Sequence, residues 1–125
     1  MRYVVADDLT GACEAALAYT KRGVRAVAWL DASLGCGGDA ELLAAETIAI
    51  DLDSRKESPA QAHARTAALL HRLRLRKPSE IVHKIDSTLR GNAGAELRAL
   101  LEYFANAVAL VAPSLPAQVE TVARN

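Results

Sequence analysis

Residues 83–92, HKIDSTLRGN, place a cation, a carboxylate, two hydroxyls, a guanidinium and an amide within ten positions. An apolar run precedes this stretch and an apolar helical pattern follows it, so the polar chemistry falls where a strand ends and a helix begins. Aspartate accepts hydrogen bonds from hydroxyls and can take a proton from one. Lysine and arginine hold anions, and arginine can grip a carboxylate through two parallel bonds. Together these residue types suit a small polyhydroxylated acid.

Polar side chains also follow the other predicted strands. Asp7 and Asp8 follow the first strand, and residues 53–55 (Asp-Ser-Arg) follow the third. Ligands of open parallel sheets bind beyond the carboxyl ends of the strands, so these side chains are expected to share one edge. A single polar residue at such a place is often a helix cap or a turn former, but the recurrence after several strands favours a binding site. Asp8, Asp53 and Asp86 are expected to cluster there.

The alternation of apolar runs and helical patterns predicts the fold. Continuous runs rich in valine, isoleucine and alanine are typical of strands covered on both faces. They occupy residues 2–6, 25–30, 46–52, 80–85 and 107–112. Helical patterns occupy residues 10–23, 58–77 and 92–104, and a glycine-rich connection with a short helix from Asp39 lies before the third strand. This order predicts a doubly wound α/β fold with about five mostly parallel strands and helices on both faces.

Local signals place the helix ends and the buried faces. Thr10 is the expected N-cap of the first helix, and Gly23 is its expected stop. Residues 58–61 (Ser-Pro-Ala-Gln) combine an N-cap, a first-turn proline and a capping-box partner. The residues expected to face the core are Cys13; Ala62, Leu69, Leu70 and Leu73; and Leu97, Leu100, Leu101 and Phe104.

Composition limits the classes of function. The chain has 125 residues, of which 51% are hydrophobic, as expected of one compact domain with its own core. Fifteen basic and fifteen acidic residues cancel, so no overall field draws the chain to nucleic acid or to an acidic membrane. The N-terminal apolar run is interrupted by two aspartates, and no apolar stretch approaches the ~18 residues of a membrane span. We therefore expect a cytoplasmic protein.

Motifs for common cofactors are missing from the sequence. The turn after the first strand, ADDLTGA, has one glycine where a dinucleotide fold needs G-x-G-x-x-G, and no Walker A motif occurs. Cys13 and Cys36 are too few and too isolated for a zinc site or a disulfide framework. The sequence predicts no metal site and no recognisable ATP cradle in this chain.

A phospho-accepting receiver domain is an alternative interpretation. Such signalling domains have about this length, acids after the first strand, an acceptor aspartate after the third and a hydroxyl after the fourth. Asp53 would be the acceptor and Ser87 the hydroxyl. A receiver also needs a lysine after the fifth strand, where this chain has Ala112 before Pro113.

Three blocks of the sequence resemble the N-terminal domain of the four-carbon acid sugar kinases. They are residues 6–16 (ADDLTGACEAA), 51–55 (DLDSR) and 83–97 (HKIDSTLRGNAGAEL). Residues 111–117 (VAPSLPA) fit the next block of that family, a proline turn, whereas the residues that follow depart from its glycine-arginine-threonine-threonine segment. The resemblance covers nearly the whole chain, and the departure leads us to expect a truncated product.

The resemblance implies a two-domain enzyme that phosphorylates tetronates (threonate, erythronate or 3-oxotetronate) in carbohydrate-acid catabolism. Residues 1–125 would be the domain that holds the acid sugar. ATP and Mg²⁺ would be bound mainly by a C-terminal domain that this chain lacks, so the chain alone is expected to be inactive. The expected partner is a small acid sugar, and a second copy of the chain, giving a homo-oligomer, is a further candidate.

The resemblance also implies roles for residues of the three blocks. Asp8 and Asp86 are the candidates for the residue that orients the attacking hydroxyl and accepts its proton, with Asp8 preferred. Arg90, either alone or with Arg55, is expected to hold the sugar carboxylate, because a planar guanidinium on a fixed turn matches a carboxylate through two parallel bonds. The residues assigned to substrate binding are Asp7, Asp53, Ser54, Arg55, Lys84, Ser87, Thr88, Arg90, Gly91 and Asn92.

Overall fold

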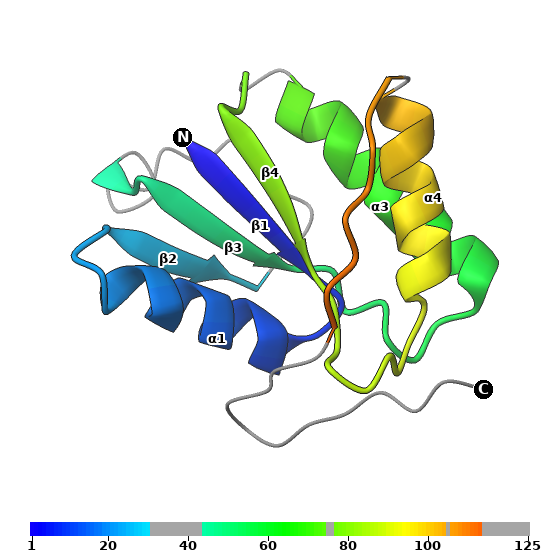
Figure 1. Cartoon of the computed structure of the whole chain (residues 1–125), viewed down its shortest axis with the longest axis horizontal. Helices are drawn as coiled ribbons and strands as arrows, with labels where there is room; N and C mark the ends of the chain where they lie inside the picture. The colour runs from blue at the N-terminus through cyan, green and yellow to red at the C-terminus, as the bar shows by residue number, and fades with distance from the viewer. Residues whose placement is uncertain (31–43, 75–76, 105, 114–125) are drawn as a thin grey trace.

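A single parallel sheet organises the chain. The computed structural model describes residues 1–30, 44–74, 77–104 and 106–113. The strands are β1 (Arg2–Ala6), β2 (Ala26–Trp29), β3 (Thr47–Asp51) and β4 (Glu80–Lys84), and the helices are α1 (Leu9–Thr20), α3 (Pro59–Arg74) and α4 (Ala93–Tyr103). The strand order is β2-β3-β1-β4, with α1 on one face of the sheet and α3 and α4 on the other (Figure 1). The predicted α/β class with helices on both faces is confirmed.

The central strand β1 brings the loops of its two neighbours together. It pairs in parallel with β3 on one side and β4 on the other. At its carboxyl end Ala6 lies level with Asp51 of β3 and with Lys84 of β4. The chain therefore leaves all three strands at the same edge of the sheet, as expected from the polar residues that follow them.

The core has two halves, one on each face of the sheet, because side chains of β1 alternate between the faces. Tyr3 and Val5 pack with Leu69 and Leu73 of α3, which confirms the predicted apolar stripe of that helix. Val4 and Ala6 pack on the other face, against α1. There Ala12 and Ala16 are small enough to let the helix lie close to the sheet. Burial of each large aliphatic side chain contributes roughly 1.5–3 kcal/mol.

The start of α3 has the predicted capping box. The Ser58 backbone N–H donates to Gln61 Oε1 at 3.1 Å, and the Gln61 N–H lies 3.4 Å from Ser58 Oγ. The predicted stop at Gly23 also agrees with the structure, since this residue has a φ of +80° just after the end of α1.

The expected fifth strand is wrong for the part of the chain that the structure describes. Residues 107–112 pair with no described strand, and Val108 and Leu110 are 96% and 94% exposed. Apolar and β-branched composition favours a strand only where a neighbouring strand supplies ladder bonds and packing. The segment instead passes along the end of β4 and the side of α4, where Leu110 and Val111 line a cavity of about 350 Å³ with Leu97.

The buried face of α4 also differs from the prediction. Glu96 and Ala99 are buried, whereas Leu101 and Phe104 are exposed. The helix is thus rotated by about one residue from the face that its leucines indicate. The cause is polar: the Glu96 side chain bonds inward to the neighbouring loop and strand, and this sets the orientation of the helix.

Two expectations for α1 are corrected. Its N-cap is Asp8, whose Oδ1 accepts from the Gly11 N–H at 2.8 Å, and not Thr10. Cys13 is exposed, because the small residues that face the sheet are Ala12 and Ala16. The expected short helix from Asp39 lies outside the described residues.

The strand order contradicts the receiver alternative. Receiver domains of the CheY type have the order 2-1-3-4-5, in which the first strand lies between the second and the third. Here β1 lies between β3 and β4. None of the described helices is long and apolar enough to cross a membrane.

Candidate functional site

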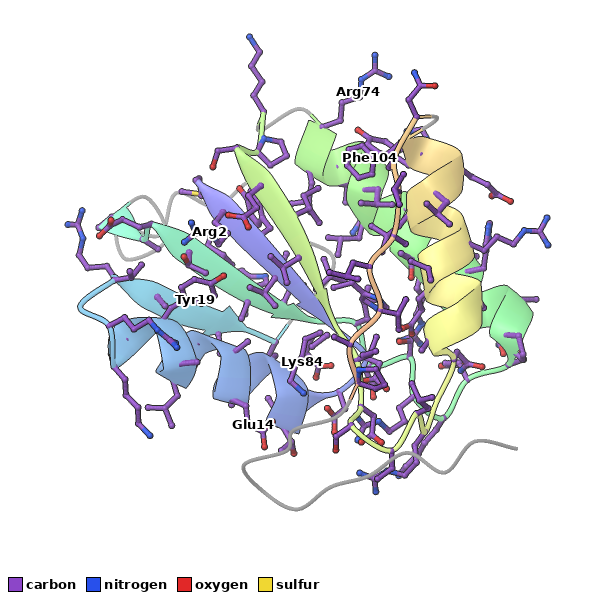
Figure 2. All side chains as sticks on the ribbon, viewed as in Figure 1. Arg2, Glu14, Tyr19, Arg74, Lys84 and Phe104 are labelled. Atoms are coloured by element: carbon purple, nitrogen blue, oxygen red, sulfur yellow. The ribbon has the colours of Figure 1, made fainter. Side chains whose placement is uncertain are left out.

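Three loops meet where the crossovers of the sheet change direction. From β1 the chain crosses by α1 toward β2, and from β3 it crosses by α3 in the opposite sense to β4. The crevice at such a switch point is the usual ligand site of open α/β sheets. The loops that surround it are residues 7–8 after β1, 52–58 after β3 and 85–92 after β4. Figure 2 shows polar side chains gathered at this end of the sheet.

Arg55 binds three aspartates at this edge. Its Nε and Nη2 donate to Oδ2 and Oδ1 of Asp7, each at 2.8 Å. Its Nη1 donates to Asp8 Oδ2 at 2.6 Å, and its Nη2 lies 3.6 Å from Asp86 Oδ1. The hydrogen bond with Asp7 is the main reason why the pKa of Arg55 is raised. Since the Asp7 side chain is only 4% exposed, its charge needs this partner, and Arg55 is the centre of a preformed cluster.

Asp86 organises the turn after β4. Its Oδ2 accepts from the Thr88 N–H at 3.0 Å, from Thr88 Oγ1 at 2.6 Å and from the Arg90 N–H at 3.2 Å. The Arg90 side chain adds two bonds, from Nε at 3.1 Å and from Nη2 at 2.6 Å. This guanidinium, opposed by burial, is the main reason why the pKa of Asp86 lies well below its usual range. Asp86 is thus an anion that holds the turn.

The two arginines of the site differ in how far their guanidinium groups remain accessible to a ligand. Arg55 has donors of all three nitrogens bonded to aspartates, and its side chain is 23% exposed. Arg90 binds Asp86 through one side of its guanidinium only, and its side chain is 68% exposed. Among the described residues no acceptor bonds to Arg90 Nη1. That terminal edge has the geometry to receive a second carboxylate in two parallel bonds.

Gly91 lets the loop after β4 pass over the Asp7–Arg55 pair. Its φ is +85°, a conformation that L side chains rarely adopt. A Cβ at this position would lie 2.7 Å from Asp7 Oδ2 and 3.3 Å from Arg55 Cγ. Glycine is therefore needed both for the turn and for the close approach of the two loops.

Asn92 and Glu96 tie the first turn of α4 to the loop after β3. Asn92 Nδ2 donates to the Ser54 carbonyl at 3.0 Å and to the Glu57 carbonyl at 2.9 Å. Ser54 Oγ donates to Glu96 Oε1, and His83 Nε2 of β4 lies 2.9 Å from Glu96 Oε2. The sequence reasoning missed Glu96 and His83. The signal that could have found Glu96 was an acid four residues after Asn92, on the same side of the helix.

Three predicted residues lie at the edge of the cluster without a direct bond to it. Lys84 Nζ donates to the Ile85 carbonyl at 3.1 Å and lies 3.7 Å from Glu14 Oε2 of α1, the pair labelled in Figure 2. Ser87 and Lys84 both line a cavity of about 230 Å³. Asp53 has a φ of +47°, and no described residue bonds to its carboxylate.

The predicted residues therefore fall into two groups. The structure brings together Asp7, Asp8, Ser54, Arg55, Asp86, Thr88, Arg90, Gly91 and Asn92 through the contacts above. Asp53, Lys84 and Ser87 lie at the same edge but outside this network. Asp8 and Asp86 share Arg55 as expected, whereas Asp53 does not join them.

The bonds of the clustered aspartates bear on whether they could hold a metal ion. No group of three His, Cys, Asp or Glu side chains among the described residues is placed to hold a metal ion. The oxygens of Asp7, Asp8 and Asp86 are bonded to N–H and O–H donors, and two guanidinium groups lie among them. This arrangement does not fit Mg²⁺, which needs open oxygen ligands.

Comparison with known families gives a match over almost the whole chain. The family described as "Sugar-binding N-terminal domain" matches residues 2–124. Similar proteins include a D-threonate kinase of Cupriavidus necator, 40% identical over 120 residues, which are 96% of this chain and 28% of that protein. A D-erythronate kinase of Heliobacterium modesticaldum is 31% identical over 114 residues, 90% of this chain and 26% of that protein. This chain therefore spans little more than a quarter of the length of these relatives.

A solved structure shares the fold. It is a crystal structure of a domain of unknown function from Bordetella bronchiseptica, described as a domain-swapped dimer with bound citrate. The TM-score is 0.66 at 32% sequence identity, and the match covers 82% of this chain and 26% of that chain.

Proposed function

Because the chain belongs to the family of sugar-binding N-terminal domains, we propose that it is the acid-sugar-binding domain of an ATP-dependent kinase. The substrate class is the four-carbon acid sugars, of the threonate, erythronate or 3-oxotetronate type. The names of the relatives support this class. The structural observation that carries the proposal is the free terminal edge of Arg90 beside a preformed cluster of carboxylates.

In this proposal Arg90 binds the sugar carboxylate, and Asp8, the most exposed aspartate of the cluster, binds one of its hydroxyls. Asp86 keeps Arg90 in place, so the guanidinium can bind a second carboxylate without first being ordered. Arg55 bonds to Asp7 and Asp8 through all three of its nitrogens, so in this proposal it organises the site and Arg90 holds the substrate carboxylate. Lys84, Ser87 and Asp53 form the outer rim, where they can contact the remaining polar groups of the sugar.

Asp8 is the better candidate for the residue that orients the attacking hydroxyl and accepts its proton. The lowered pKa of Asp86 makes it a poor proton acceptor, and its oxygens are filled by the turn that it holds. Asp8 caps α1 with one oxygen and meets Arg55 with the other, and its side chain is 24% exposed. In phosphoryl transfer, positioning of the hydroxyl contributes more than strong base catalysis.

ATP and Mg²⁺ are proposed to bind outside this chain. The described carboxylates do not fit Mg²⁺, and the relatives are several times longer than this chain. We therefore propose that residues 1–125 bind the acid sugar but transfer no phosphate alone. The reaction would take place in the cytoplasm. The citrate and the domain-swapped dimer of the Bordetella structure support a small carboxylic acid as ligand and self-association of the chain.

Calorimetry with the purified chain tests the proposal. D-threonate and D-erythronate are expected to bind, while threitol, a four-carbon polyol without a carboxylate, is expected to bind far more weakly. Arg90→Lys should weaken tetronate affinity by about 1–3 kcal/mol, because lysine cannot form the two parallel bonds. Arg98→Lys is a matched control, since Arg98 also pairs with an acid four residues away but lies on the exposed side of α4. No binding of any tetronate, or equal effects of the two substitutions, would contradict the proposal.

A further inference from the structure

A buried polar group adjoins the site, and it includes Ser54, which was assigned to substrate binding from the sequence but whose hydroxyl donates to Glu96. It consists of Ser54, His83 and Glu96, which we call the Glu96 cluster. Ser54 and Glu96 are fully buried, and the His83 side chain is 9% exposed. Ser54 Oγ donates to one oxygen of Glu96, and His83 Nε2 lies 2.9 Å from the other.

Glu96 occupies a position where packing alone would favour an apolar side chain. It lies on the buried side of α4 with Ala99, and a buried carboxylate is unfavourable unless it is bonded and its charge is balanced. Three features offset this penalty: the Ser54 hydroxyl, the His83 ring, and the place of Glu96 in the first turn of α4, where the helix dipole favours an anion. The bonds of Glu96 therefore explain its presence here.

These bonds join three separate elements. Ser54 belongs to the loop after β3, His83 belongs to β4, and Glu96 belongs to α4. Asn92, one turn before Glu96, donates to the carbonyl of the same Ser54 at 3.0 Å. The start of α4 thus holds Ser54 at both its hydroxyl and its carbonyl.

Ser54 in turn places Arg55. The backbone N–H groups of both residues donate to the Asp7 carbonyl, at 3.0 and 3.1 Å. The Arg55 side chain then binds the Asp7 carboxylate through two bonds. The position of Arg55 therefore depends on two anchors, Asp7 at the end of β1 and Glu96 on α4.

We infer that Glu96 is a positioning residue of the sugar site. Through Ser54 it holds Arg55 against the three aspartates, and through α4 it holds the turn that carries Arg90. It does not contact the sugar itself. The expected effect on sugar affinity rests on the proposed function, whereas the expected effect on Arg55 does not.

Two measurements on the same variants test this inference. The first is solvent exchange of the Arg55 Nε–H, followed by NMR and identified by the loss of its signal in Arg55→Lys. The second is D-threonate affinity by calorimetry. In Glu96→Leu, exchange should quicken and affinity should fall, each by roughly ten-fold or more, because small misplacements in a binding site have large effects. Glu96→Gln can still accept from Ser54 Oγ and should restore both values to near those of the wild type.

A control and a second variant complete the design. Glu102→Leu makes the same change on an exposed side of the same helix and should alter neither measurement. If Glu96→Leu does not fold, Ser54→Ala breaks the link to the loop while Glu96 and His83 keep their contact, and it should show the same two effects. Unchanged Arg55 exchange in a folded variant would overturn the inference, as would altered exchange with unaltered affinity. If the wild type binds no tetronate, the proposed function fails, and Arg55 exchange alone then decides the positioning role.

Discussion

Replacement of Gly91 by alanine tests how closely the two loops of the site approach. Alanine at this position has two costs. The first is the backbone conformation: a φ of +85° costs an L residue about 1–2 kcal/mol. The second is steric, because the new Cβ would lie 2.7 Å from Asp7 Oδ2, where an ordinary contact begins at 3.4 Å.

The steric cost can be worked from the neighbours. Asp7 would have to retreat by roughly 0.7 Å, but it is held by two bonds from Arg55, whose Cγ lies only 3.3 Å from the same Cβ. Overpacking against a fixed group costs typically about 1–3 kcal/mol. Gly91→Ala should therefore lower the free energy of unfolding by about 2–5 kcal/mol in total.

Alanine substitutions at two other glycines distinguish the backbone cost from the steric cost. Gly23 has a φ of +80° with nothing within 4 Å of its Cβ position, so Gly23→Ala should show only the backbone cost of about 1–2 kcal/mol. Gly94 lies in α4, also with open space, so Gly94→Ala should be neutral or stabilising by about 0.5–1 kcal/mol. Urea unfolding of the three variants measures these values. If Gly91→Ala destabilised the chain no more than Gly23→Ala, the close approach of the loops would be refuted.

Three further predictions concern charge and capping. Arg55→Gln should lower the free energy of unfolding by roughly 2–4 kcal/mol, below the usual range for a fully buried pair because Arg55 is partly exposed, and an unchanged urea midpoint would refute it. The lowered pKa of Asp86 means that its stabilising effect is present above its ordinary value of 3.8 and is lost as the pH falls further, so stability should decrease below about pH 4. In Arg90→Gln this acid-induced decrease should be shallower, as measured by urea midpoints at several pH values. Ser58→Ala should cost about 1 kcal/mol through loss of the α3 cap, and thermal unfolding would show it.

The parts of the fold that depend on local pattern could be predicted from the sequence. Three features follow from residues within a few positions of one another. The first four strands follow from apolar runs, and the apolar stripe of α3 follows from the helical spacing of its apolar residues. The capping box follows from the residue types at Ser58 and the next three positions. The meeting of Asp7, Asp8 and Asp86 at one edge was also predictable, because parallel strands deliver their carboxyl ends to the same place.

The remaining features depend on partners distant in the sequence. Residues 107–112 have a strand-like composition, but pairing needs an edge strand in register, which composition does not show. The rotation of α4 depends on Glu96 finding Ser54 and His83 in two other elements. Asp53 follows its strand as predicted, but no described residue bonds to its carboxylate, and its φ is +47°. An acidic residue after a strand therefore predicts that the residue lies at the carboxyl edge of the sheet. It does not predict the direction in which the side chain points.

The bonding of Arg55 to Asp7 and Asp8 has a consequence for how substrate preference can change in evolution. A substitution in that cluster disturbs a buried carboxylate and so threatens folding before it alters recognition. The rim residues make no direct bond to this cluster, so their substitution should disturb folding less. They are Asp53, Lys84 and Ser87. Under the proposed function, a change of substrate should therefore arise at the rim while the cluster stays the same. Exchange of rim residues between relatives named for different tetronates should then transfer substrate preference at little cost in stability.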